Sequence, residues 1–386
     1  KVSVLFVAMN DISGKGGDSM ATKDMLSAFV EDPRASTTAV LPEPQGELPE
    51  TVKTTETMYI LPLSDKSAKD YAKYSLLSFP VIRRAIKNYD PDIVVARMHA
   101  VLIAPAIFTS LYGKPYVLLS RGTAYKSLRF SSVLKRIYKM NVRRADEVYT
   151  ASQEIKQDTD EMRKKRQTEA KVFPNGIDPE LFEPMSKREA RKRLELGLRD
   201  EDFVVGFVGS MGPRHTVDRL IKSVQQIDDE IPIKLLLMVG GPKLEDYRKL
   251  AEESGIADKT VFTGFVPHES VSEYVSACDI TYGVTEQESA TPIKCFEYLA
   301  CERPLIVRDI PELSFVAEEE VGVQVEEIDE DAIADAVEYL YGLEEGERNS
   351  MVERGRKYVL ENHTWDRLVD IVLEDLSEIP KANIEK

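Results

Sequence analysis

Short apolar runs, each followed by a turn and a helix-like segment, recur along the first half of the sequence. They occupy residues 2–8, 38–41, 58–61, 93–96 and 115–119. Continuous apolar runs of this length are typical of strands buried on both faces of a parallel sheet, with helices as the connections. This half of the chain is therefore predicted to form a doubly wound α/β domain.

The same rhythm starts again after a highly charged connector at residues 187–202. The strand-like runs of the second half occupy residues 203–209, 233–241, 260–264, 280–283 and 305–307. Two consecutive α/β series in 386 residues, a length that exceeds one typical core, predict two Rossmann-like domains facing each other across a cleft. We expect a first domain of residues 1–184 together with a C-terminal helix at about 364–386, and a second domain of residues 185–363.

The two halves differ in charge. Residues 1–184 carry 27 Lys and Arg against 23 Asp and Glu, whereas the remainder carries 24 against 44. Seven basic residues and no acidic one lie between positions 126 and 144, namely Lys126, Arg129, Lys135, Arg136, Lys139, Arg143 and Arg144. Such a segment can lie on an anionic membrane surface, hold an anionic acceptor or form a solvated helix face. A nucleic acid is not expected as a partner, because the acidic half would repel a polyanion.

The three cysteines, Cys278, Cys295 and Cys301, have neither paired spacing nor nearby histidines. We therefore expect reduced, partly buried thiols in a cytoplasmic protein, without a disulfide framework or a zinc site. The first strand-like run lacks the cationic lead and the cleavage site of a signal peptide, so none is expected. Since no apolar run reaches the ~18 to 20 residues of a spanning helix, any membrane contact would be peripheral, on the inner face.

The stretch from Thr291 to Ala300 predicts a helix that carries ligand-binding groups at its start. Thr291 is expected to be the N-cap and Pro292 the first helical residue. Lys294 and Glu297 are three residues apart and fall on one face. A helix N-terminus with a cation can bind a diphosphate, and a carboxylate can bind a sugar diol. The alternative is an ordinary amphipathic helix with a solvated Lys–Glu pair.

Polar side chains also follow two strand-like runs of the first half. Arg97 and His99 end one run, and Arg121 follows the next. Ligands of open α/β sheets bind at the carboxyl ends of strands, so these residues are candidates for a site. Asp90 and Asp92 match the DxD pattern of metal-dependent sugar transferases but lie at the amino end of a strand. We interpret them as part of a turn, and no metal site is expected.

With these segments placed, the sequence resembles the retaining GT-B glycosyltransferases of family 4, the glycosyl transferases group 1. The resemblance covers nearly the whole chain. Its motifs are Gly16-Gly17, Phe173-Pro174-Asn175-Gly176-Ile177-Asp178, Gly206-Phe207-Val208-Gly209-Ser210, Val239-Gly240-Gly241, Val261-Phe262-Thr263-Gly264, the Thr291 to Ala300 helix and Trp365. It implies that the first domain binds the acceptor, that the second binds a sugar nucleotide, and that the C-terminal helix crosses back to the first domain.

For the donor, the resemblance implies that Glu297 holds the ribose and that N–H groups near Thr291 bind the diphosphate. The loop ending at Val266 would border the base. Ser289 stands where the family keeps a first glutamate, with Glu288 beside it. The donor-binding residues implied in this way are Gly209, Ser210, Gly240, Gly264, Val266, Glu288, Thr291, Pro292, Ile293 and Glu297.

Three cations, Arg214, His215 and Lys294, are implied to neutralise the leaving diphosphate. His99 matches a family histidine and is expected either to act as a helper base or to satisfy local backbone groups. The implied acceptor-binding residues are Gly16, Gly17, Arg97 and Arg121. The two remaining histidines, interpreted as surface or structural residues, are His268 and His363. No metal or cofactor is implied, and the co-substrate would be a UDP- or GDP-linked sugar.

The resemblance implies a hexosyltransferase that moves a sugar to an acceptor hydroxyl with retention of anomeric configuration. The acceptor would be a lipid-linked saccharide, a polysaccharide or a glycolipid precursor. One alternative is a nucleotide-sugar epimerase of the same architecture, although its characteristic carboxylates and histidine are not apparent. Another is a catalytically weakened nucleotide-sugar-binding subunit, because serines at 210 and 289 replace the family's arginine and glutamate.

Overall fold

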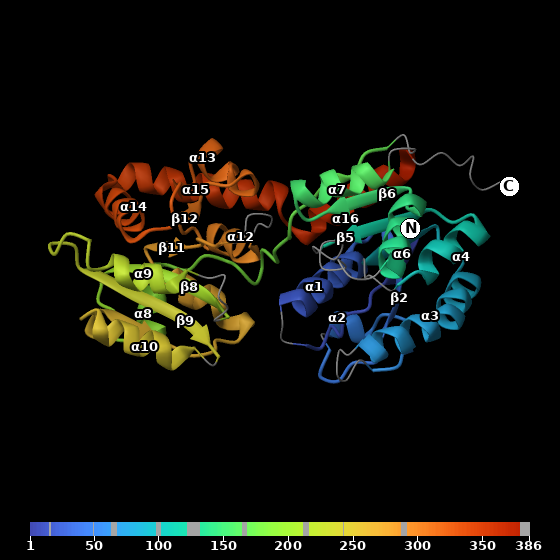
Figure 1. Cartoon of the computed structure of the whole chain (residues 1–386), viewed down its shortest axis with the longest axis horizontal. Helices are drawn as coiled ribbons and strands as arrows, with labels where there is room; N and C mark the ends of the chain where they lie inside the picture. Colours follow the sequence, from blue (N-terminus) through green and yellow to red (C-terminus); the bar gives the residue numbers. More distant parts are fainter. Residues whose placement is uncertain are drawn as a thin grey trace. The chain divides into compact units, whose positions relative to one another are not determined.

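The chain forms two compact units in a computed structural model that describes residues 1–14, 17–48, 50–62, 68–97, 102–121, 132–163, 168–210, 216–241, 243–286 and 292–378. The first unit comprises Lys1–Gly176 and Trp365–Lys386, and the second comprises Ile177–Thr364 (Figure 1). Residues 177–184, which the sequence pattern placed in the first domain, belong to the second unit. The reason is that Ile177 and Phe182 are buried in the core of that unit.

The first unit is built on a seven-stranded parallel sheet of order β3-β2-β1-β4-β5-β6-β7. The strands are β1 (Val2–Val7), β2 (Ala35–Pro42), β3 (Thr57–Ile60), β4 (Ile93–Arg97), β5 (Tyr116–Ser120), β6 (Glu147–Thr150) and β7 (Lys171–Val172). Strand β1 pairs with β2 on one side and with β4 on the other. The winding direction reverses at β1 and β4, and ligands of such sheets bind at the carboxyl ends of the strands at this point.

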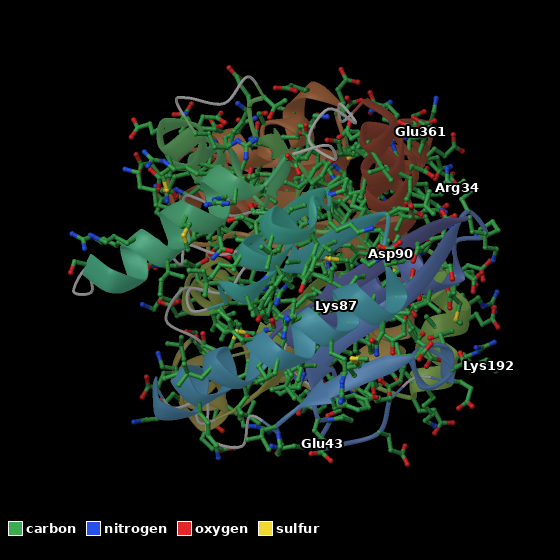
Figure 2. All side chains as sticks on the ribbon, turned by 90° about the vertical axis from the view of Figure 1, so that its right-hand side faces the viewer. Arg34, Glu43, Lys87, Asp90, Lys192 and Glu361 are labelled. Carbon is green, nitrogen blue, oxygen red and sulfur yellow. The ribbon has the colours of Figure 1, made fainter. Side chains whose placement is uncertain are left out.

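Helices connect these strands and cover the sheet. They are α1 (Gly17–Glu31), α2 (Glu50–Lys53), α3 (Ala68–Tyr89), α4 (Ala104–Tyr112), α6 (Ser132–Arg144), α7 (Gln153–Arg163) and α16 (Trp365–Glu378). Although α16 follows the second unit in the sequence, it contacts α1 in the first unit. Asp370 of α16 pairs with Arg34, which lies beside that helix in Figure 2. Asp375 accepts hydrogen bonds from Tyr149 and, at 2.5 Å, from Lys171.

The second unit is built on a six-stranded parallel sheet of order β10-β9-β8-β11-β12-β13. The strands are β8 (Phe203–Ser210), β9 (Ile233–Gly240), β10 (Thr260–Phe262), β11 (Ile280–Tyr282), β12 (Leu305–Arg308) and β13 (Gly322–Val325). The apolar strands are buried between helices on both faces, as continuous runs require. The prediction of two Rossmann-like α/β domains is confirmed.

The helices of the second unit come from the segments predicted between its strands. They are α8 (Lys187–Leu194), α9 (Val217–Ser223), α10 (Leu244–Glu253), α11 (Val271–Ser276), α12 (Ile293–Ala300), α13 (Phe315–Glu318), α14 (Glu330–Gly342) and α15 (Glu345–Asn362), with short 3₁₀ turns at η1 (Ala257–Lys259), η2 (His268–Ser270) and η3 (Pro311–Leu313). The segments that enter and leave this unit lie side by side. The Ile177 N–H donates to the His363 carbonyl at 2.8 Å, and Ile177 bridges to Thr364.

The turn before β4 holds the two aspartates of the DxD pattern in structural contacts. Asp90 has a φ of 42°, and its carboxylate pairs with Lys114 at 2.6 Å. Figure 2 shows Asp90 at the end of α3. The Asp92 carboxylate accepts the Ser3 N–H at 2.8 Å and so ties the turn to β1. Within the described ranges, no cluster of His, Cys, Asp and Glu could hold a metal ion.

All three cysteine thiols are buried and unpaired, and burial raises the pKa of each to about 12. Thiols with so high a pKa are protonated and poorly reactive at neutral pH. Within the part of the chain that the structure describes, no helix combines the length and apolarity needed to cross a bilayer.

Candidate functional site

Helix α12 begins at the carboxyl edge of the second sheet. Pro292, which the sequence pattern placed inside the helix, is instead the N-cap. Its backbone is extended, with ψ 131°, so the helix starts one residue later, at Ile293. Thr291 lies outside the described residues. The Cys295 N–H donates to the Pro292 carbonyl at 3.0 Å. The N–H groups of Ile293 and Lys294, which precede it, have no partner within the helix and carry a partial positive charge, so they can bind an anion.

Lys294 is buried in the first turn of α12, with 9% of its surface exposed. Its Nζ lies 4.1 Å from the centroid of the Phe207 ring in β8. A Cβ at Gly209 would lie 3.0 Å from both that Nζ and the Phe207 ring, so a side chain at this position would crowd the ammonium group. Burial lowers the pKa of Lys294 to about 8. The structure thus brings Gly209 and Lys294 together.

Glu297 is also buried, with 4% of its surface exposed. Its Oε1 lies 2.9 Å from Nε2 of His268, which comes from the η2 turn. The imidazole is held from another side by the edge of the Phe182 ring, at a centroid distance of 5.3 Å. The interpretation of Lys294 and Glu297 as a solvated pair is therefore wrong. The interpretation of His268 as a surface or structural histidine missed its contact with Glu297.

Aromatic contacts fix α12 against the sheet. The Tyr298 hydroxyl accepts the Val208 N–H of β8 at 2.7 Å. On the opposite side of the helix, the Phe296 ring stacks on the His363 imidazole, with 4.0 Å between centroids and an interplanar angle of 20°. Burial lowers the pKa of His363 to about 4, so this histidine is a neutral packing residue. These contacts determine where Lys294 and Glu297 lie relative to the end of β8.

The carboxyl ends of β9 and β10 lie beside the end of β8, at the same edge of the second sheet. A Cβ at Gly240 would lie 3.1 Å from the Cβ of Phe265, so the loop after β10 folds closely over the end of β9. Gly264 in that loop has a φ of 77°, a conformation that side-chain-bearing residues rarely adopt. Val266 follows in the loop and is partly buried. Because β10, β9 and β8 are neighbours in the sheet, Gly264, Gly240 and Gly209 lie along one edge.

In the first unit, Arg97 lies at the switch point between β1 and β4. It is 5% exposed. Its Nη1 donates to Asn10 Oδ1 at 2.6 Å, and its Nη2 pairs with Asp18 in the first turn of α1. Gly17 begins this helix and has no atom within 4 Å of an added Cβ. Arg97 and Gly17 therefore lie at the same end of the sheet.

Arg121 follows β5, and its guanidinium contacts residues close to Gly176, where the first stretch of the first unit ends. Nη1 donates to the Pro174 carbonyl at 2.9 Å and also to that of Phe173. The guanidinium lies 5.5 Å from the Phe173 ring and 5.7 Å from the Trp365 ring. Burial, together with the charge of Arg97, lowers the pKa of Arg121 to about 9. Arg121 thus contacts both Phe173–Pro174, just before the chain leaves the first unit, and Trp365, where the chain returns to it. The sequence pattern did not indicate this contact.

Several residues implied by the resemblance lie outside the described residues and stay predictions. They are Gly16, His99, Arg214, His215, Glu288 and Thr291. The backbone of Ser210 ends β8, while its side chain is not among those described.

Comparison with known proteins identifies the family. Residues 188–358 match the model of the glycosyl transferases group 1, and residues 34–181 match that of Glycosyltransferase Family 4. A D-inositol 3-phosphate glycosyltransferase of Stackebrandtia nassauensis is 30% identical over 52% of this chain and 47% of its own length. A GDP-mannose-dependent alpha-(1-6)-phosphatidylinositol monomannoside mannosyltransferase of Mycolicibacterium smegmatis is 30% identical over 50% of this chain and 52% of its own. The chain thus spans about half the length of these curated relatives.

The fold has counterparts among solved structures. Anabaena HepE in complex with UDP superposes with a TM-score of 0.75 at 16% identity, covering 97% of this chain and 100% of HepE. At this identity the likeness shows the fold alone. Together with the two family models, it establishes that the chain belongs to the glycosyl transferases group 1 family and has the GT-B fold.

Proposed function

We propose that this protein transfers a sugar from a UDP- or GDP-linked donor to an acceptor hydroxyl, with the donor bound by the second unit. The observation that carries the proposal is the start of α12. There Lys294, in the first turn of the helix, has its buried ammonium group against the glycine at 209, and the buried carboxylate of Glu297 follows on the same helix. A nucleoside diphosphate offers the matching groups, namely two phosphates and a ribose diol.

The proposed reaction depends on stabilising the negative charge that develops on the leaving nucleotide. The bond between the anomeric carbon and the diphosphate breaks, and the nucleotide leaves with additional negative charge. Lys294 and the N-terminus of α12 would stabilise that charge in a water-poor setting, which is the largest contribution that such a site makes. Arg214 and His215 are proposed as further cations, so the scheme contains no metal or other cofactor. In the proposed retaining route, the acceptor oxygen bonds to the same face of the sugar while its proton passes to the leaving phosphate.

Calorimetric titration with UDP-, GDP- and ADP-linked sugars tests the proposal. We expect at least one of them to bind and to be consumed when an acceptor is supplied. If none binds, the donor site is refuted. Binding without hydrolysis or transfer would favour the weakened binding subunit, and conversion of the bound sugar to its epimer without an acceptor would favour the epimerase.

We further propose that the acceptor is lipid-linked and that the protein works at the anionic, cytoplasmic face of a membrane. The supporting observation is the surface formed by α3, α4 and α6, in which α4 contacts both other helices. Arg144 Nη1 donates to Ser110 Oγ at 2.5 Å, and Arg83 Nε donates to the Tyr112 hydroxyl at 3.2 Å, which joins the helices. Lys87 of α3 faces the viewer near the centre of Figure 2.

This surface combines apolar and basic side chains. Leu76 of α3 is 73% exposed and Leu111 of α4 is 65% exposed. Basic residues on α3 and α6 include Lys73, Arg83, Arg84, Lys87, Lys135, Arg136, Lys139, Arg143 and Arg144. Exposed leucines among cations match the boundary between anionic headgroups and acyl chains. Residues 126–131, the start of the basic segment, lie outside the described residues.

Replacing Lys135, Arg136 and Lys139 with Ser is expected to lower partitioning onto anionic vesicles by about 100-fold, since each basic residue near such a surface contributes about 1 kcal/mol. Sedimentation with phosphatidylglycerol vesicles measures this. A matched control removes three exposed lysines of the second unit, Lys192, Lys249 and Lys357, with the same change in charge. Unchanged partitioning of the first variant, or an equal loss in the control, would remove the membrane proposal.

A further inference from the structure

The Glu297 carboxylate has a single described hydrogen-bond partner, and that partner comes from a distant part of the sequence. His268 Nε2 lies 2.9 Å from Glu297 Oε1, and the two residues are 29 positions apart in the chain. The carboxylate side chain is 5% exposed and the imidazole 20% exposed. A buried carboxylate needs a hydrogen-bond donor, because leaving it without one is costly. His268 meets that need on one of the two oxygens.

The imidazole itself is held in place. Its ring meets the edge of Phe182, whose side chain is 1% exposed and belongs to the core around α12. His268 opens the η2 turn, directly after Pro267. The turn follows the loop in which Gly264 has a positive φ. The position of the ring is therefore set by the core on one side and by the loop after β10 on the other.

We infer that His268 is a positioning residue for the ribose of the donor, an inference that rests on the proposed function. By occupying Oε1 of Glu297, it fixes the rotation of the carboxylate and leaves Oε2 to accept from the ribose hydroxyls. A carboxylate that could rotate would lose entropy on binding and would aim its oxygens poorly. The same contact links Glu297 to the loop expected to border the base, so ribose and base would be recognised by one connected unit.

Nucleotides with and without the ribose hydroxyls, compared in pairs, test this role. UDP and GDP are titrated into the wild type and the His268→Ala, His268→Gln, Glu297→Ala and double alanine variants, alongside 2′,3′-dideoxy-UDP and 2′,3′-dideoxy-GDP. A hydrogen bond to a charged group contributes about 1.5 to 3 kcal/mol, so the wild type should prefer the ribonucleotide by about 10-fold or more. His268→Ala should lose most of this preference while its affinity for the dideoxy analogue stays unchanged. His268→Gln, which retains an N–H donor, should restore part of the preference.

The double variant provides a second readout. If His268 acts through Glu297, the double variant should bind the ribonucleotide no more weakly than Glu297→Ala alone. The role would be overturned if the losses of affinity in the two single variants were additive, or if His268→Ala weakened binding of the ribo and dideoxy forms equally. Either result would indicate that His268 contacts the base or supports the fold. Thermal unfolding of each variant separates loss of structure from loss of recognition. If the wild type binds neither UDP nor GDP, the donor site itself fails. If it binds and discriminates but His268→Ala still discriminates, only the role of His268 fails.

Discussion

Replacing Lys294 with Met is expected to lower kcat for sugar transfer by about 100- to 1,000-fold, the usual effect of removing one group that stabilises charge in a transition state. Met is close to Lys in length, and its thioether can contact the Phe207 ring over which the ammonium group lies, so α12 should remain in place. The rate is measured with the nucleotide sugar selected by calorimetry. Lys192→Met is the matched control, because Lys192 is exposed on α8 of the same unit (Figure 2).

The pH dependence offers an independent check on the same residue. Burial lowers the pKa of Lys294 to about 8 in the free protein. The ammonium group is charged below that pH and loses its charge above it. Because kcat/KM reports the ionisation of free enzyme, it should fall with a slope approaching tenfold per pH unit above pH 8. This decline should be absent in Lys294→Met. A variant with wild-type kcat, or with the same alkaline decline, would show that another cation serves the diphosphate.

The largest loss of stability is expected from Arg191→Met. Arg191 of α8 donates to Asp279 Oδ2 at 2.8 Å, and both side chains are almost fully buried, at 2% and 5% exposure. Arg191 also donates to the Ala277 carbonyl at 2.9 Å. Without the guanidinium, the carboxylate of Asp279 would retain the Val204 N–H and Lys187, which is 37% exposed. Breaking a buried pair by removing one partner lowers the free energy of unfolding by about 3 to 5 kcal/mol, and the remaining Lys187 contact favours the lower end.

Arg193→Met is the control for this prediction. Arg193 lies two residues along the same helix, is 54% exposed and pairs with Glu189 one turn earlier. An exposed pair of this kind contributes at most about 1 kcal/mol. Urea unfolding followed by circular dichroism compares the two variants. Similar losses for Arg191 and Arg193 would mean that the buried pair contributes no more than a surface pair, and that α8 is fastened by its apolar contacts instead.

Much of the fold could be predicted because it rests on local patterns. A continuous apolar run specifies a strand buried on both faces wherever it occurs, and two series of such runs specify two sheets. The unit boundary was harder to place. The segment around Ile177 and Phe182 has the composition of a turn, and only its packing in the second core shows where it belongs. The start of α12 was missed by one residue, because the φ of Pro292 suits a cap and a first helical residue alike.

The candidate site could be predicted only in part. Helical spacing placed Lys294 and Glu297 on one face, yet spacing does not tell whether that face is solvated or buried. Burial is decided by Phe207 and Gly209, which belong to a strand more than eighty positions earlier. The contact of His268 with Glu297 likewise joins a loop to a helix, and neither residue carries a local signal of the other. Long-range pairs of this kind depend on the completed fold.

The path of the chain through the two units has a consequence for the order of folding. The second unit is an insertion, since the chain enters it after Gly176 and leaves it after Thr364. During synthesis, all of its residues emerge before the first unit has α16. That helix supplies Asp370 and Asp375, the partners of Arg34 and Tyr149. The unit encoded first is thus the one completed last, and until then its α1 surface lacks the helix that covers it.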